Sequence, residues 1–196
     1  MRTRSLIAVA AIAPLLAGAG TAHAAKKPPP KKPTCKLVQD ATADGTGTGL
    51  GVDGPNDPNF DITYADLATN TKTLTAVIGL ATVDGSGSTS PTGRTYDVVF
   101  NRGTTAVTIR AMLEPTGNVW AGGKGTGYID AAKKEIRINV PLSALAVVIK
   151  PGDKLTDLKA ATWRWAGPDV SLGKVDSAIG VVPYVAGWPS CVKVGL

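Results

Sequence analysis

Strand-like alternation of apolar and polar residues runs through most of the chain after residue 35 and leaves little room for helices. Residues 73–80 and 135–140 alternate residue by residue, which is typical of half-buried strands. Further β-branched or aromatic runs lie at 60–68, 96–100, 106–112, 160–166 and 179–185. Breaks rich in glycine, proline and other turn-forming residues separate these runs. The pattern predicts an all-β fold, a two-sheet antiparallel β-sandwich of immunoglobulin-like or jelly-roll-like type.

At most one short helix is expected. It would begin at Pro141, because proline suits the first turn of a helix, and would turn Leu142, Leu145 and Val148 inward. The glycine-rich segment 122–127 contains a lysine, but Ser or Thr does not follow it directly as a phosphate-binding P-loop requires. We interpret this segment as a flexible hairpin loop.

Residues 1–24 have the three parts of a secretory signal peptide. Arg2 and Arg4 give a positive start, the apolar run 6–17 follows, and Ala22-His23-Ala24 is a small-x-small cleavage site. The apolar run is too short to cross a hydrocarbon core of ~30 Å as a helix. We therefore predict export by the general secretory route, cleavage after Ala24, and an extracellular protein without a membrane span.

The net positive charge of the chain lies outside the expected domain. The chain has 21 Lys and Arg against 15 Asp and Glu, but six of the basic residues precede residue 33. Residues 25–34 are rich in lysine and proline, which predicts an extended basic spacer that could contact an anionic envelope polymer. Because nucleic-acid-binding domains carry their basic patch on the fold, we expect no nucleic-acid partner.

The two cysteines, Cys35 and Cys191, flank the expected domain, residues 35–196. An even cysteine number in an exported chain favours a disulfide, and two cysteines allow a single pairing. Two free buried thiols are the alternative, since a metal site needs more ligands than one such pair. We predict that a Cys35–Cys191 bond closes a single β-sandwich domain.

Catalytic residues are scarce. The only histidine, His23, lies in the leader, so the exported protein would lack histidine-based nucleophilic catalysis and histidine zinc sites. The chain has two glutamates, Glu114 and Glu135, and no pair of aspartates stands out for glycoside hydrolysis. We predict a non-enzymatic protein, with a hydrolase using Asp carboxylates as the less favoured alternative.

Several aspartates gather in a glycine-rich segment near the start of the domain: Asp40, Asp44, Asp53, Asp57 and Asp61. Carboxylates on a compact loop suit Ca²⁺, which takes about six to eight oxygen ligands, although the spacing is not that of an EF-hand. The candidate ligands of a structural calcium ion are Asp44, Asp53, Asp57 and Asp61. Ordinary Asp-Gly and Asp-Pro turns are the alternative.

Two tryptophans, Trp163 and Trp165, flank Arg164 and therefore face the same side of a strand. They are two of the four tryptophans in a chain that is poor in aromatic residues. Exposed, the pair would offer apolar ring faces and N–H donors to sugar rings. Buried between two sheets, it would instead belong to the core.

The order of the segments carries a wider pattern. An Asp- and Gly-rich loop is followed by FDITYADLAT, LTAVIGLA, YDVVF, IRINVPLSAL, PGDKL and VDSAIGVVPYVAGWPSC. Over residues 35–192 this order resembles exported β-sandwich domains related to DOMON domains and family 9 carbohydrate-binding modules. The resemblance implies a two-sheet sandwich that binds sugar or haem, sometimes with structural Ca²⁺. Haem is disfavoured, because Met112 would be the only axial Met or His left after cleavage.

Two functional classes follow. The first is an interaction or structural protein of the cell envelope, and the alternative is a carbohydrate-binding module for an extracellular polysaccharide or envelope polymer. Tryptophans in a shallow outer groove would favour the module, and tryptophans interdigitated between two sheets would favour the structural protein.

Overall fold

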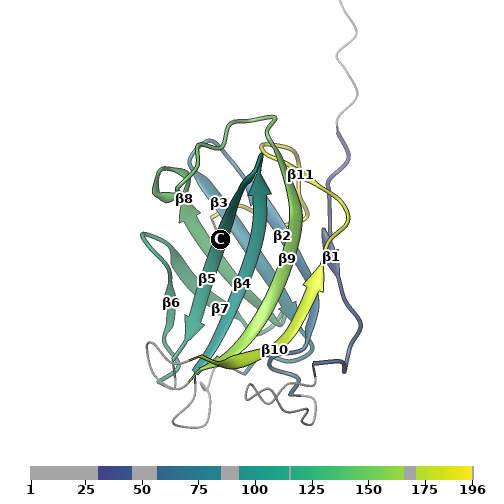
Figure 1. The fold of residues 1–196 in the computed structure, drawn as a ribbon, viewed down its shortest axis with the longest axis vertical. Helices are drawn as coiled ribbons and strands as arrows, with labels where there is room; N and C mark the ends of the chain where they lie inside the picture. The colour runs from purple at the N-terminus through teal and green to yellow at the C-terminus, as the bar shows by residue number, and fades with distance from the viewer. Residues whose placement is uncertain (1–30, 46–56, 85–92, 115, 166–170, 196) are drawn as a thin grey trace, which may run out of the picture. The chain divides into compact units, whose positions relative to one another are not determined.

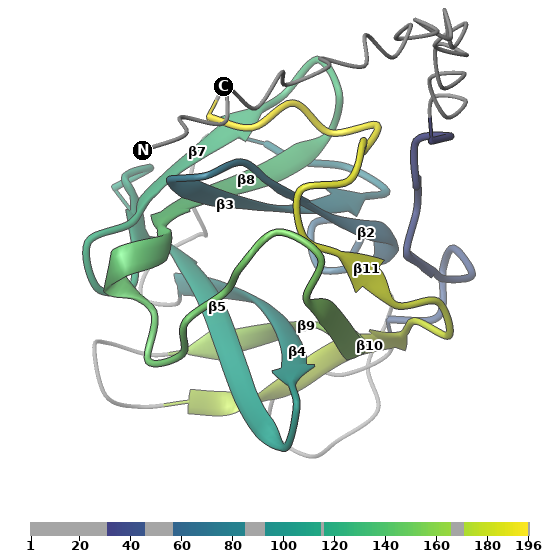
Figure 2. The ribbon, with the colours of Figure 1, turned by 90° about the horizontal axis from the view of Figure 1, so that it is seen from above.

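The computed structural model describes residues 31–45, 57–84, 93–114, 116–165 and 171–195, which build two antiparallel β-sheets packed face to face (Figures 1 and 2). The first sheet has the order β1-β2-β3-β8-β7, formed by Val38–Gln39, Ile62–Thr69, Thr73–Leu80, Glu135–Pro141 and Thr126–Asp130. The second has the order β10-β9-β4-β5-β6, formed by Ser171–Ile179, Lys154–Trp165, Gly93–Arg102, Thr105–Leu113 and Val119–Ala121. A short strand β11, Tyr184–Val185, pairs with β9. The predicted all-β two-sheet antiparallel sandwich is confirmed.

The core lies between the two sheets, and alternate residues of each strand enter it. Ile78 of β3 faces Ile136 of β8 in the first sheet, and Val98 of β4 faces Ala160 of β9 in the second. All four side chains are fully buried. Burial of one large aliphatic side chain contributes roughly 1.5–3 kcal/mol, so the inward-facing residues hold the two layers together.

The predicted strand over 179–185 is wrong. Strand β10 ends at Ile179, and only Tyr184–Val185 is strand again. Ile179 and Val181 are 66% and 92% exposed, so they form no inward face. Gly180 lies against Leu37, the residue before β1. A Cβ added to Gly180 would be 2.5 Å from the Leu37 carbonyl oxygen. The chain leaves the sheet at this contact, and the next proline, which has no N–H, cannot extend the ladder.

The expected helix after Pro141 is a single 3-10 turn, η1 (Leu142–Ala144). Leu142 and Leu145 pack partly on the core, but Val148 is 69% exposed, so its predicted inward position is wrong. The backbone is already extended at Leu145. Alternation by two therefore replaces the helical spacing, and Ile149 is the buried residue.

The interpretation of residues 122–127 as a hairpin loop is also wrong. Strands β6 and β7 on either side of the loop belong to different sheets, so the loop carries the chain from one layer to the other. Gly123 has a φ of 69°, which suits glycine in this turn. At Gly127 a Cβ would lie 2.6 Å from Val119 Cγ1, so this glycine lets the two sheet edges approach.

The first and last described segments lie side by side. Cys35 and Cys191 form the predicted disulfide, with a Cα–Cα distance of 5.1 Å. The Thr34 N–H donates to the Pro189 carbonyl (3.0 Å), and the Cys191 N–H donates to the Thr34 carbonyl (3.2 Å). Lys31 Nζ lies 3.9 Å from the centre of the Trp188 ring. The end of the predicted spacer is therefore attached to the domain.

Beyond the disulfide, the C-terminal segment crosses the outer face of the first sheet (Figure 2). Val192 packs on Ala68 and Val77, and the Gly195 N–H donates to Thr75 Oγ1 (3.1 Å). This outer face is thus covered by the C-terminal segment, whereas Trp163 and Trp165 belong to β9 of the second sheet. None of the described helices is long and apolar enough to pass through a membrane.

Candidate functional site

Trp163 and Trp165 lie on the outer face of the second sheet. In β9, Ala160 and Thr162 are fully buried and face the core, so the odd-numbered residues after them face outward. Trp163 is half-buried and Trp165 is 9% exposed, and neither belongs to the core cluster between the sheets. The tryptophans are therefore not interdigitated between the layers.

The residue between them, Arg164, points to the opposite side. Its guanidinium lies 4.8 Å from the centre of the Phe60 ring and donates to Asp57 Oδ2 at 3.1 Å. Arg164 thus closes one end of the core, and the predicted alternation of this strand is confirmed. Asp57 also accepts the Asn59 N–H at 3.1 Å, so its carboxylate serves this corner of the fold.

A glycine on the neighbouring strand explains how Trp165 is held. Gly93 of β4 lies directly opposite Trp165, and a Cβ on it would be 2.2 Å from both Cε2 and Nε1 of the indole. The ring therefore lies across the backbone of β4. Glycine in a strand commonly marks such a close approach. The same arrangement occurs on the other sheet, where the Tyr64 ring covers Gly79.

Trp120 completes an aromatic row on this outer face. The register pairs Trp163 with Thr95, Thr95 with Met112 and Met112 with Trp120, which are contributed by β9, β4, β5 and β6. Trp120 is 51% exposed. Residues directly opposite each other across antiparallel strands point to the same face, so these side chains lie in one line.

A cavity of about 250 Å³ opens beside this row and is lined by Met112, Glu114, Trp120 and Trp165. We refer to it as the tryptophan cavity. Another cavity, of about 320 Å³, lies along β5 and η1, and its lining residues are small or aliphatic apart from Arg110. Arg110 is already paired with Asp97. The tryptophan cavity therefore offers the more specific chemistry.

The polar groups of the tryptophan cavity are incompletely used. The buried Nε1 atom of Trp165, which lines the cavity, has no hydrogen-bond partner within the described part of the chain, and neither has that of Trp163, which does not line it. The Glu114 carboxylate accepts the Thr116 hydroxyl (3.3 Å) and forms no ion pair there. A buried donor without an acceptor costs about 1–3 kcal/mol. The Nε1 of Trp165 lies over Gly93, so the cavity itself offers apolar ring faces and one carboxylate acceptor.

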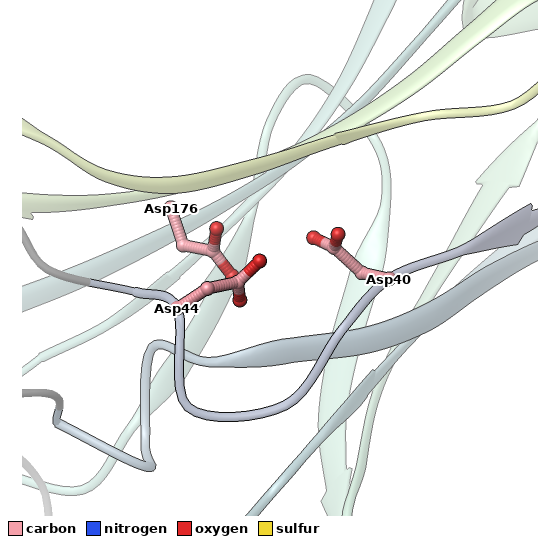
Figure 3. A group of neighbouring side chains, drawn as sticks. All are labelled: Asp40, Asp44 and Asp176. Carbon is pink, nitrogen blue, oxygen red and sulfur yellow. The ribbon is translucent and has the colours of Figure 1, made fainter.

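Three carboxylates form a second group at the open edge between the sheets. Oxygen atoms of Asp40, Asp44 and Asp176 lie within 4.8 Å of one another (Figure 3). Asp40 and Asp44 lie on the loop after β1, and Asp176 projects toward them from β10. The buried Asp176 also accepts the Ile62 N–H (2.7 Å) and thereby links β10 to β2. This group could hold a metal ion.

The electrostatics of this acidic group favour a cation. Burial, followed by the charges of Asp176 and Asp44, raises the pKa of Asp40 to about 6. Burial also raises the pKa of Asp176, and the charges of Asp44 and Asp61 add to that shift. No Lys or Arg of the described segments forms an ion pair with the three carboxylates. Like charges held together without a counter-charge suit a hard, oxygen-preferring ion such as Ca²⁺.

No family model matches the chain, and no curated protein matches it. The two-sheet fold that the resemblance to DOMON domains and family 9 carbohydrate-binding modules implied is present. Membership of either group stays a prediction.

Of the four predicted calcium ligands, the structure brings Asp44 into the acidic group. Asp53 lies outside the described residues, and Asp57 pairs with Arg164. Asp61 is buried next to the group and accepts the Ala43 N–H at 2.7 Å. Asp40 belongs to the predicted acidic segment but was not among the chosen ligands. Asp176 was not predicted, because it belongs to a strand more than a hundred residues away and carries no local signal.

Of the predicted tryptophan pair, Trp165 lines the tryptophan cavity and Trp163 does not. Trp120, Met112 and Glu114 were not predicted to lie beside Trp165, because their position depends on β4 separating β9 from β5. One usable signal existed. A glycine at the start of a β-branched strand, Gly93, is typical of a position covered by a large ring.

Proposed function

We propose that this protein is an exported, non-enzymatic binding module and that its tryptophan cavity holds carbohydrate. The observation that carries the proposal is the cavity itself, which joins the rings of Trp120 and Trp165 to the Glu114 carboxylate. A sugar ring has an apolar C–H face and a rim of hydroxyl groups that both donate and accept. It therefore matches stacking surfaces with polar groups at their edge.

The expected affinity is modest. Apolar area removed from water contributes about 25 cal/mol per Å², and a sugar covers a limited part of an indole that is already half-buried. A single cavity of this kind should bind in the micromolar to millimolar range, as roughly 4–8 kcal/mol corresponds to such dissociation constants. A structural or interaction role in the cell envelope remains the alternative, and it requires no retention of glycan.

Replacing Trp120 by alanine should abolish glycan binding and leave stability almost unchanged. Trp120 is half exposed in the middle of the short edge strand β6, and surface substitutions usually change the free energy of unfolding by about 0.5 kcal/mol or less. Retention on insoluble polysaccharides, together with the melting temperature, measures both effects. Trp188→Ala is the matched control, because Trp188 is 37% exposed and does not line the cavity. Undiminished glycan retention by the Trp120 variant would contradict the proposal.

We further propose that the acidic group of Asp40, Asp44 and Asp176 binds Ca²⁺ as a structural ion. A cation there would neutralise repulsion at the edge where β1, β2 and β10 meet. It would add to the hydrogen bond from Ile62 to Asp176, which already joins the two sheets. The ion would thus stabilise the fold as a purely structural element.

Calcium should raise the melting temperature by about 5 °C or more at a hundredfold excess over its dissociation constant, because ligand binding stabilises the folded state by mass action. Asp44→Asn should remove the rise, and Asp130→Asn, which changes an acid paired with Lys133 elsewhere, should retain it. Thermal melts in calcium and in excess chelator measure the effect. An equal melting temperature of the native protein in both would leave the three aspartates without a metal.

The calcium effect should also depend on pH in a defined direction. Since folding raises the pKa of Asp40 to about 6 from its ordinary 3.8, the ion-free fold favours protonated Asp40. This contribution to stability is complete below about pH 4 and is lost as the pH rises through about 6. Calcium should therefore stabilise the protein above about pH 6 and have little effect near pH 4, in the same melts.

We propose that the protein is exported. Two features support this: the signal-peptide pattern of the leader, and the disulfide, since disulfides persist in oxidising compartments. Cleavage after Ala24 should give an extracellular form that begins at Ala25. The intact mass of protein recovered from the culture medium measures this. Recovery of the uncleaved chain in the membrane fraction would refute the predicted cleavage.

A further inference from the structure

We infer that the sugar held by the tryptophan cavity carries a free amino group, so that the ligand is a cationic amino-sugar polymer. This inference rests on the proposed carbohydrate-binding function and names the class of sugar. The observation behind it is the charge of the cavity lining. Of the described residues that line it, two offer indoles, one a thioether, and one an ionisable side chain, the Glu114 carboxylate.

The register places Glu114 where it can reach the same ligand as Trp165. Leu113 lies opposite Arg94, so the next residues along, Glu114 and Gly93, are neighbours on the outer face. Trp165 covers Gly93 from the other side. The carboxylate and the indole thus flank one glycine, with no side chain between them.

Two cations of the second sheet, Arg110 and Lys174, are engaged with other side chains. Arg110, two residues before Met112 on β5, donates to both carboxylate oxygens of Asp97 at 2.7 Å each. Lys174, opposite Trp163 on β10, donates to Ser177 Oγ at 2.9 Å. Neither forms an ion pair with Glu114. Among the described residues, the Glu114 carboxylate of the cavity lining therefore has no counter-charge.

An ammonium group satisfies this lining better than a hydroxyl group does. The faces of indole rings carry a negative partial charge and attract cations, most strongly where water is displaced. A ligand that enters the cavity removes water from Glu114, which is costly for a carboxylate without a counter-charge. An ammonium group supplies that charge and donates to Glu114, while the apolar face of the same sugar stacks on the exposed ring of Trp120.

Calorimetric titration of the mature protein with three oligosaccharides of equal length tests the inference. The probes are a glucosamine oligomer with free amines, its N-acetylated counterpart and a glucose oligomer, at a pH at which the amines are protonated. We expect the glucosamine oligomer to bind about tenfold more tightly than either neutral oligomer. Glu114→Gln should remove this preference and retain the weaker neutral binding, and Asp130→Asn should change nothing.

The outcomes separate the inference from the function on which it rests. Equal binding of all three oligomers, or a preference that survives in Glu114→Gln, overturns the amino-sugar inference and leaves carbohydrate binding intact. Loss of the preference in Asp130→Asn overturns it as well, because the amines would then respond to acidic surface charge in general. No binding of any oligomer overturns both proposals. Since the native protein alone distinguishes the oligomers, the test does not depend on the folding of a variant.

Discussion

Replacing Cys35 and Cys191 together by serine is expected to lower the free energy of unfolding by about 5 kcal/mol. The bond joins residues 156 apart in the sequence, and in the chain-entropy model a closed loop of that length restricts the unfolded chain by about this amount. The figure is an upper estimate, because unfolded chains keep some structure. Typical domains are stable by only about 5–15 kcal/mol, so the loss is a large fraction of the total.

The disulfide also organises the native state locally. It lies next to the backbone contacts of Thr34 with Pro189 and Cys191, and immediately before Val192, which packs on the outer face of the first sheet. Urea unfolding of the double variant measures the loss, and the reduced native protein should match it. A change below about 1 kcal/mol in both would mean that the backbone contacts alone hold the two ends of the domain together.

Replacing Trp165 by alanine is expected to cost about 3–5 kcal/mol of stability and to abolish glycan binding as well. Trp165 is 9% exposed and covers the backbone of β4 at Gly93, so its removal leaves a void over the start of that strand. It also removes one wall of the tryptophan cavity. Trp165 should therefore differ from Trp120, whose replacement affects binding alone.

The glycine beneath the ring provides an independent probe. Gly93→Ala would place a Cβ 2.2 Å from the present indole atoms and must displace the ring, so it should reproduce much of the Trp165→Ala effect while keeping the tryptophan. Urea unfolding and polysaccharide retention measure both variants. Unchanged stability of Trp165→Ala would show that the indole contributes no packing over β4 and that other residues bury that strand.

Local sequence patterns predicted several strands correctly. Residues 73–80 and 135–140 are strands, as their alternation with a period of two predicted, although the C-terminal segment buries the outer face of β3 as well. The pattern failed at 179–185, where close contact of Gly180 with the Leu37 carbonyl takes the chain off the sheet. It failed at Val148 because one 3-10 turn gave way to extended backbone, and no local residue announces where that change occurs.

The candidate sites were predictable only where their members are neighbours in the chain. Trp163 and Trp165 share a face because strand residues two apart always do. Asp40 and Asp44 lie on one loop, so their proximity follows from the short distance along the chain. Asp176 and Trp120 belong to the same two sites through strand pairing alone.

The sequence by itself determined the all-β class, the single disulfide pairing and the alternation of the tryptophan strand. These properties depend on backbone periodicity and on the number of cysteines, which are local or countable. Tertiary structure decided that β4 lies between β9 and β5 and that β10 closes against β2. Strand order depends on the total burial achieved by all the strands together, so no single segment encodes it. The tryptophan cavity and the acidic group exist because of that order.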